Sequence, residues 1–228
     1  MNAAREWSRV RAVVWKDLTA ERRARANFNA VVAFAGLVLV LFGVALGPDA
    51  EAVREAAAGI VWLTVLFGGV LAFHRSYQLE LENGALEALL LYPGDRRAIF
   101  LGKLAANLVF LLFVEAVALP VASILYGLPL LRPFPGLAAV FLLGTLGFAT
   151  LGTFYAAMAT RVRAREVLLP LLLFPMLIPL LVAAVEATSA VLAGDPLGNL
   201  GTWLGLLATF DAVFLVAAVL AFEHVIEG

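Results

Sequence analysis

Three carboxylates stand inside stretches of the sequence that are otherwise apolar, namely Glu115, Glu186 and Asp211. A carboxylate placed in hydrocarbon costs ~3 kcal/mol or more, so we expect these side chains to face a helix-bundle interior or water. A functional role, as a polar track or a hydrogen bond between spans, fits them about as well as a purely structural one. Glu186, which Thr188 and Ser189 follow, also fits a position at the membrane surface.

Few other residues in the sequence carry chemistry. The histidines, His74 and His224, fall near the ends of apolar runs, where they fit titratable surface residues better than ligands of a haem iron. The chain has no cysteine, no G-x-x-x-x-G-K-[ST] sequence, and neither an H-E-x-x-H nor a G-x-S-x-G motif. We therefore predict no catalytic residue, no bound cofactor or metal, and no ATP hydrolysis by this chain.

A polar segment over residues 79–100 is the longest interruption of the apolar sequence. Asn83 can cap a short helix over residues 84–91, with Glu87 near its positive end and Tyr92-Pro93-Gly94-Asp95 ending it. A helix of about two turns cannot span a bilayer. We expect this segment to lie at or below the membrane surface.

The composition identifies the class of protein, because 63% of the 228 residues are apolar and 14% are charged. Runs of about 20 apolar residues favour transmembrane helices over the alternating strands of a barrel. We predict an all-α integral membrane protein that forms one transmembrane domain. Its six expected spans cover residues 28–47, 56–73, 101–126, 136–160, 167–193 and 200–222.

Residues 1–27 precede the first expected span and are rich in arginine. One side of this segment carries apolar residues at helical spacing, which are Trp7, Val10, Val14 and Leu18. This pattern predicts an interfacial amphipathic helix. A soluble basic tail is the alternative.

The basic residues are distributed unevenly over the predicted loops. If the N-terminus is cytoplasmic, fourteen of the 16 lysines and arginines lie on the cytoplasmic side, and Arg54 and Arg132 face out. This positive-inside bias predicts that both termini and the segment over residues 79–100 are cytoplasmic.

The fifth expected span contains Pro170, Pro175 and Pro179. Each proline removes a backbone donor and strains a helix, so we predict a broken or kinked span that forms a hinge. Kinked helices also occur in passive bundles.

Four sequence blocks resemble one known family. They are Lys16-Asp17-Leu18, ENGALEALLLYP at 82–93, LGTLGFATLGTF at 143–154 and LFPMLIPLL at 173–181. Together they resemble the CcmB family, the B subunit of the haem exporter of cytochrome c maturation. The Gly-x-Leu-Glu block is shared widely among ABC-2 type permeases. Asn83-Gly84 departs from the more usual Asp-Gly pair, which keeps the cap and loses a charge.

The resemblance implies the permease subunit of an ATP-binding-cassette complex in the bacterial inner membrane, present in two copies. It implies a cytoplasmic ATPase partner, the A subunit, which binds ATP, together with the C and D subunits and the haem chaperone, the E protein. Haem is then a possible substrate, and release of haem-loaded chaperone is the other use of ATP. The residues that we expect to contact the ATPase are Glu82, Asn83, Gly84, Glu87, Asp95 and Arg96.

Other functions remain open from the sequence. An ABC-2 type permease could carry another substrate, and a proton-coupled secondary transporter would use Glu115, Glu186 and Asp211 as a relay. An assembly scaffold would need no ATP hydrolysis. We expect contact with membrane lipid and none with nucleic acid.

Overall fold

The computed structural model describes residues 3–23, 25–47, 49–82, 95–131, 133–160, 165–195 and 198–227. In these ranges the regular structure is helical and contains no strand. The helices are α1 (Ala3–Arg23), α2 (Arg25–Ala45), α3 (Ala50–Glu82), α5 (Arg97–Tyr126), α6 (Phe134–Ala159), α7 (Arg165–Ala193) and α8 (Leu200–Glu227).

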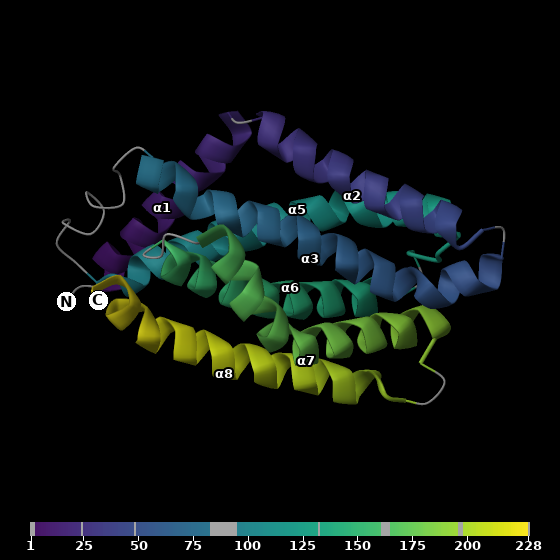
Figure 1. The fold of residues 1–228 in the computed structure, drawn as a ribbon. Coiled ribbons are helices and arrows are strands. Elements are labelled where there is room, and N and C mark those ends of the chain that lie inside the picture. Colours follow the sequence, from purple (N-terminus) through teal and green to yellow (C-terminus); the bar gives the residue numbers. More distant parts are fainter. Residues whose placement is uncertain are drawn as a thin grey trace.

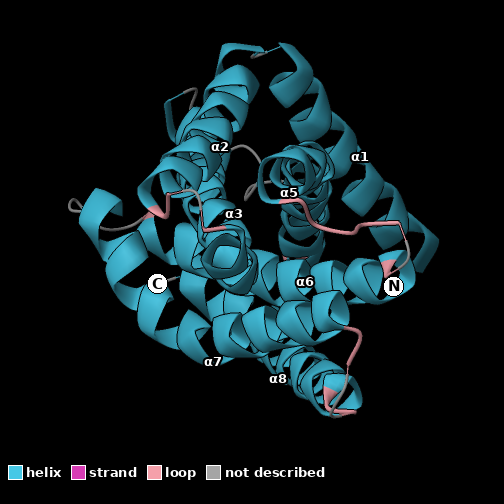
Figure 2. Cartoon of the chain, turned by 90° about the vertical axis from the view of Figure 1, so that its right-hand side faces the viewer, coloured by secondary structure: helices cyan, strands magenta, loops and turns pink. Residues whose placement is uncertain are grey.

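The helices from α2 to α8 run along one bundle, and α1 crosses its flank obliquely at one end (Figure 1). Both termini lie at this end, which we call the terminal end (Figure 1). Viewed along the bundle, α3 and α6 lie between α2 and α5 on one side and α7 and α8 on the other (Figure 2). The α6 helix packs against α3, α5, α7 and α8, so it forms the centre of the bundle.

Among the residues that the structure describes, five helices are long and apolar enough to cross a membrane. These candidate spans are Glu51–Tyr77, Arg97–Tyr126, Phe134–Ala159, Pro170–Ala193 and Leu200–His224. The apolar part of α2 is shorter and covers Asn29–Ala45. The structure thus supports an all-helical protein with five candidate spans, and the sixth predicted span stays a prediction.

The second predicted span differs from the structure at its end. It is predicted to end at residue 73, whereas α3 continues as a helix to Glu82. Beyond the hydrocarbon a helix can continue in water with polar residues, so the end of the apolar run at residue 73 does not mark the end of α3. The predicted helix over residues 84–91, with Asn83, Gly84 and Glu87, lies outside the described residues.

The proline-rich fifth span is one helix, because α7 is helical from Arg165 to Ala193 with all three prolines inside it. The α7 ribbon changes direction along its length (Figure 1). Pro175 and Pro179 are exposed on its surface. The helix is therefore bent rather than interrupted, and its use as a hinge stays a prediction.

Candidate functional site

The start of α5 is attached to the end of α8. Asp95 Oδ1 accepts a hydrogen bond from the backbone N–H of Arg97 at 2.9 Å, which satisfies one free donor of the helix start. Arg97 Nη2 lies 3.2 Å from Glu223 Oε2. The rings of Phe100 and Phe222 are 5.1 Å apart. An ion pair and an aromatic contact therefore join the first turns of α5 to the last turns of α8.

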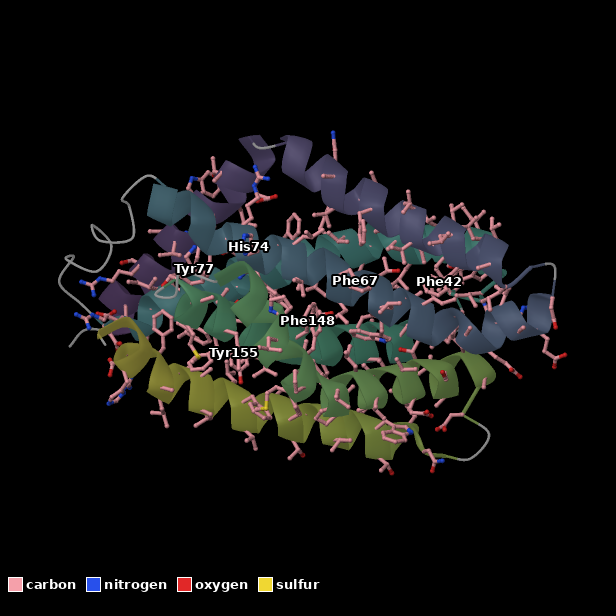
Figure 3. All side chains as sticks on the ribbon, viewed as in Figure 1. Phe42, Phe67, His74, Tyr77, Phe148 and Tyr155 are labelled. Carbon is pink, nitrogen blue, oxygen red and sulfur yellow. The ribbon has the colours of Figure 1, made fainter. Side chains whose placement is uncertain are left out.

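A buried cation joins α5 to α1 and α3. The side chain of Lys103 is completely buried, and its Nζ donates a hydrogen bond to the carbonyl oxygen of Ser76 at 2.8 Å. The same Nζ lies 3.2 Å from Asp17 Oδ2 on α1 and 4.5 Å from the ring centroid of Tyr77. Tyr77 lies at the terminal end (Figure 3). A buried ammonium group needs such partners, because its desolvation alone is strongly unfavourable.

The α1 helix approaches α5 closely beside this ion pair. A Cβ atom added at Gly102 would lie 2.6 Å from Val13 Cβ and 3.2 Å from the carbonyl oxygen of Val10. Val10 and Val13 are buried, whereas Trp7 is 66% exposed. Trp7 therefore lies off the face of α1 that packs on α5, which Val10, Val13 and the partly buried Asp17 form, and the interfacial position of the helix stays a prediction.

Three of the six residues predicted to contact an ATPase fall in the described part of the chain, and they lie near these attachments. Glu82 is the last residue of α3, and Asp95 and Arg96 directly precede α5. The segment between them thus begins and ends on two helices that Lys103 holds together.

The spacing of two Gly-Thr pairs in α6, Gly144-Thr145 and Gly152-Thr153, serves packing against α3. A Cβ atom at Gly144 would overlap the indole ring of Trp62, and one at Gly152 would overlap the ring of Phe73. Trp62 and Phe73 are both at most 1% exposed. Only glycine leaves room for these aromatic side chains, so the two helices can approach closely.

Trp62 also connects α3 to α7. Its Nε1 donates a hydrogen bond to Thr188 Oγ1 at 2.9 Å. Its ring stacks on Phe141 of α6, with centroids 5.0 Å apart and planes inclined by 8°. A buried indole N–H needs an acceptor, and here the acceptor comes from a third helix.

The threonines of the same two pairs bind α5. Thr145 Oγ1 donates a hydrogen bond to Glu115 Oε1, and Asn107 Nδ2 donates one to Thr153 Oγ1 at 2.9 Å. The two pairs are eight residues apart on both helices, which fixes the antiparallel register of α5 and α6. Glu115 is 2% exposed, and its Oε2 has no hydrogen-bond partner in the described part of the chain.

Asp211 approaches α6 from α8. Its side chain is 4% exposed, and a Cβ atom at Gly147 would overlap its Oδ1. Neither carboxyl oxygen of Asp211 has a hydrogen-bond partner within the ranges that the structure describes. Thr145 and Gly147 are two residues apart, so Glu115 and Asp211 meet α6 on different sides.

The third carboxylate is separate from the other two. Glu186 is exposed on α7, so the structure does not bring it into the bundle. His74 is partly buried on α3 and His224 is exposed on α8. The described residues contain no group of three or more His, Cys, Asp or Glu side chains that would hold a metal ion.

Apolar helices of this length, joined by polar side chains that pair between helices, define a multi-span helical membrane protein. Two of its blocks, the Gly-Thr pairs of α6 and the Lys-Asp sequence of α1, form contacts between helices rather than a reaction centre.

Comparison with known proteins identifies the family. The family model described as "CcmB protein" matches residues 8–228. Heme exporter protein B of Pseudomonas aeruginosa is 30% identical over 88% of this chain and 89% of its own length. The proteins of that name from Rhodobacter capsulatus and Escherichia coli K12 are 32% and 31% identical over 78% and 90% of this chain, covering 81% and 96% of their own lengths. The chain belongs to the CcmB family.

Proposed function

We propose that this chain is the membrane-spanning permease subunit of an ATP-binding-cassette haem exporter complex that acts in c-type cytochrome biogenesis. The observation that carries the proposal is the family match over residues 8–228, together with relatives that are named heme exporter protein B. The sequence has no nucleotide-binding motif, so ATP hydrolysis is assigned to a separate cytoplasmic subunit.

The contacts at the start of α5 support a coupling role for the segment over residues 79–100. A movement imposed on this segment by an ATPase would act directly on α5, which follows it. Lys103 would pass the movement to α1 through Asp17, and Arg97 would pass it to α8 through Glu223. Two short polar contacts thus connect the segment to both ends of the chain.

The position of the termini supports six spans. The apolar part of α2, Asn29–Ala45, has 17 residues and is therefore about 25 Å long, at the lower end of the ~17–25 residues that a transmembrane helix needs. It packs against α3 and α5. With α2 crossing the membrane, an even number of spans places both termini on one side, in agreement with their common end of the bundle (Figure 1).

In this proposal the termini are cytoplasmic and the complex lies in a bacterial inner membrane, with two copies of this chain. Its partners are an ATPase of the A type, the C and D subunits and the haem chaperone. Haem is the substrate class, either transported or released on its chaperone. The chain itself makes and breaks no covalent bond.

Deletion of the gene and its replacement on a plasmid test the function. We expect the deletion strain to lose c-type cytochromes with covalently attached haem, as measured by haem staining, and the plasmid to restore them. A deletion strain with normal c-type cytochromes, and without accumulated haem-loaded chaperone, would overturn the proposal.

Charge reversals test the coupling segment. Glu87→Lys combined with Arg96→Glu should reduce the amount of ATPase that co-purifies with the chain. Asp95 is left intact, because its carboxylate holds the first turn of α5. Glu51→Lys, an exposed charge at the other end of α3, is the matched control. If the natural chain, the double variant and Glu51→Lys all co-purify the same amount of ATPase, the site assignment is wrong.

Single cysteines test the orientation, since the natural chain has none. Cysteines at Asp49 and Asp195 should react with an impermeant reagent added outside intact cells, and a cysteine at Glu82 should not. The opposite labelling pattern would contradict cytoplasmic termini.

A further inference from the structure

Two tryptophans on α1 point away from the bundle. Trp7 is 66% exposed and Trp15 is 73% exposed, and the exposed Arg11 lies between them. The three residues are four positions apart, so they follow one line along the helix. We call this line the Trp7–Arg11–Trp15 face.

The contacts on the opposite side of α1 fix the direction of this face. Val13 packs against Gly102 so closely that no Cβ atom fits there, and Asp17 holds the buried Nζ of Lys103. Rotation of α1 about its axis would break both contacts. The two indoles therefore point outward because the inner face is occupied.

The position of α1 places this face at the edge of the membrane. The helix crosses the flank of the bundle at the terminal end (Figures 1 and 2). The next helix, α2, exposes a set of apolar side chains, which are Leu37, Val40, Leu41 and Val44. A flank covered by such residues faces hydrocarbon, so α1 lies where this flank meets the lipid headgroups.

The charge on the exposed side of α1 selects the kind of lipid. The exposed positions of α1 in the described residues include Arg11 and Lys16 and no carboxylate. Lys16 Nζ lies 3.2 Å from Asp17 Oδ1, so Arg11 carries most of the charge of this face. Glu6, which is half-buried, binds Arg9 at 3.0 Å. The outward surface is therefore cationic and aromatic. Such a surface complements the phosphates of an anionic leaflet, whereas a surface in water has no need of exposed indoles.

We propose that the Trp7–Arg11–Trp15 face binds the headgroups of anionic phospholipids in the leaflet at the terminal end. The indoles lie at the level of the glycerol backbone, where tryptophan is favoured. The guanidinium group of Arg11 donates two hydrogen bonds to one phosphate, as arginine does at bidentate phosphate contacts. The assignment does not depend on the transported substrate or on ATP.

Tryptophan fluorescence in defined membranes tests the proposal. The full chain contains four tryptophans, so the variant Trp62→Phe/Trp203→Phe leaves Trp7 and Trp15 as the only indoles. It is reconstituted in phosphatidylcholine with increasing amounts of brominated phosphatidylglycerol. We expect quenching at a lower lipid fraction than with brominated phosphatidylcholine, and Arg11→Gln should raise the required fraction about fivefold. The control Arg54→Gln, at the other end of the bundle, should not.

Trp62 is buried, so its replacement could prevent folding, and a second measurement is needed that keeps it. The difference in quenching between the natural chain and Trp7→Phe/Trp15→Phe then reports the same two indoles with Trp62 and Trp203 in place. Equal quenching by the two brominated lipids, or an unchanged response in Arg11→Gln, would overturn the proposal. Quenching by aqueous acrylamide that disappears only when the partner ATPase is added would instead show a protein-docking surface.

Discussion

Lys103 Nζ lies 3.2 Å from Asp17 Oδ2, although the two residues are 86 positions apart in the sequence. The lysine is completely buried, whereas 18% of the aspartate side chain is exposed. The pair thus lies at the solvent-exposed edge of the contact between α1 and α5. Its aspartate explains why the buried Lys103 is stable near the start of the apolar helix α5.

Removal of the aspartate should destabilise the protein more than removal of both partners. Asp17→Ala leaves the ammonium group of Lys103 buried without its counter-charge, which costs about 3–5 kcal/mol. We expect a clearly lower midpoint of thermal unfolding in detergent, and partial recovery in the double variant Asp17→Leu/Lys103→Met. Glu6→Ala, which breaks the half-buried Arg9–Glu6 pair on the same helix, is the control and should cost ~1 kcal/mol or less. Equal midpoints for the two single variants would contradict a buried ion pair.

A methyl group at Gly152 should be poorly tolerated. The added Cβ overlaps the ring of Phe73, which is completely buried and packs edge-on against Phe148. Gly152→Ala is expected to cost ~1–3 kcal/mol, measured as the shift of the unfolding midpoint. Gly59→Ala is the matched control, because a Cβ atom there has no neighbour within 4 Å and helix propensity favours alanine by up to ~1 kcal/mol. Similar effects of the two changes would show that α6 does not pack on Phe73 as described.

The buried carboxyls provide a test between the permease and a proton-coupled transporter. Glu115→Gln keeps an oxygen that accepts the hydrogen bond of Thr145, and Asp211→Asn keeps the size of the side chain, but neither variant carries a titratable proton. We expect both strains to retain c-type cytochromes by haem staining, provided that the protein is present at the normal level. Loss of cytochromes in either strain, with normal protein, would favour the proton relay.

Replacement of the α7 prolines should change the rate of the cycle rather than the stability. Pro175 and Pro179 are exposed, so alanine at both positions removes no buried packing and restores two backbone donors. We expect an unchanged or higher unfolding midpoint and slower ATP hydrolysis by the reconstituted complex. Pro120→Ala on α5, also an exposed proline inside a helix, is the control. Unchanged hydrolysis in the α7 variant would leave no role for a hinge.

The sequence predicted the helices better than their ends and contacts. Apolar runs of about 20 residues locate spans because the hydrocarbon requires that length. The same rule does not show that α3 continues to Glu82, since a polar helix in water has no apolar run. Lys103 counts as a cytoplasmic surface charge in the positive-inside argument, yet its side chain is buried by a partner that local spacing does not reveal.

The α6 block illustrates the same limit for the candidate site. The sequence identifies LGTLGFATLGTF as a family block, but its spacing does not show which residues contact which helix. In the structure its glycines accommodate Trp62 and Phe73 of α3, and its threonines bind α5. These assignments need the three-dimensional register of helices that are far apart in the sequence.

The hydrogen bonds between α5 and α6 have a consequence for biosynthesis. The α5 helix leaves the ribosome first, so Glu115 and Asn107 reach the membrane before the hydroxyl groups of Thr145 and Thr153 exist to bind them. Unpaired polar groups in lipid are unfavourable, so α5, although apolar enough to span the membrane, is less stable there before α6 joins it. In a pulse-chase experiment, chains truncated after Leu130 should be degraded faster than chains truncated after Thr160. The polar side chains of α5 are then satisfied only when α6 has been synthesised.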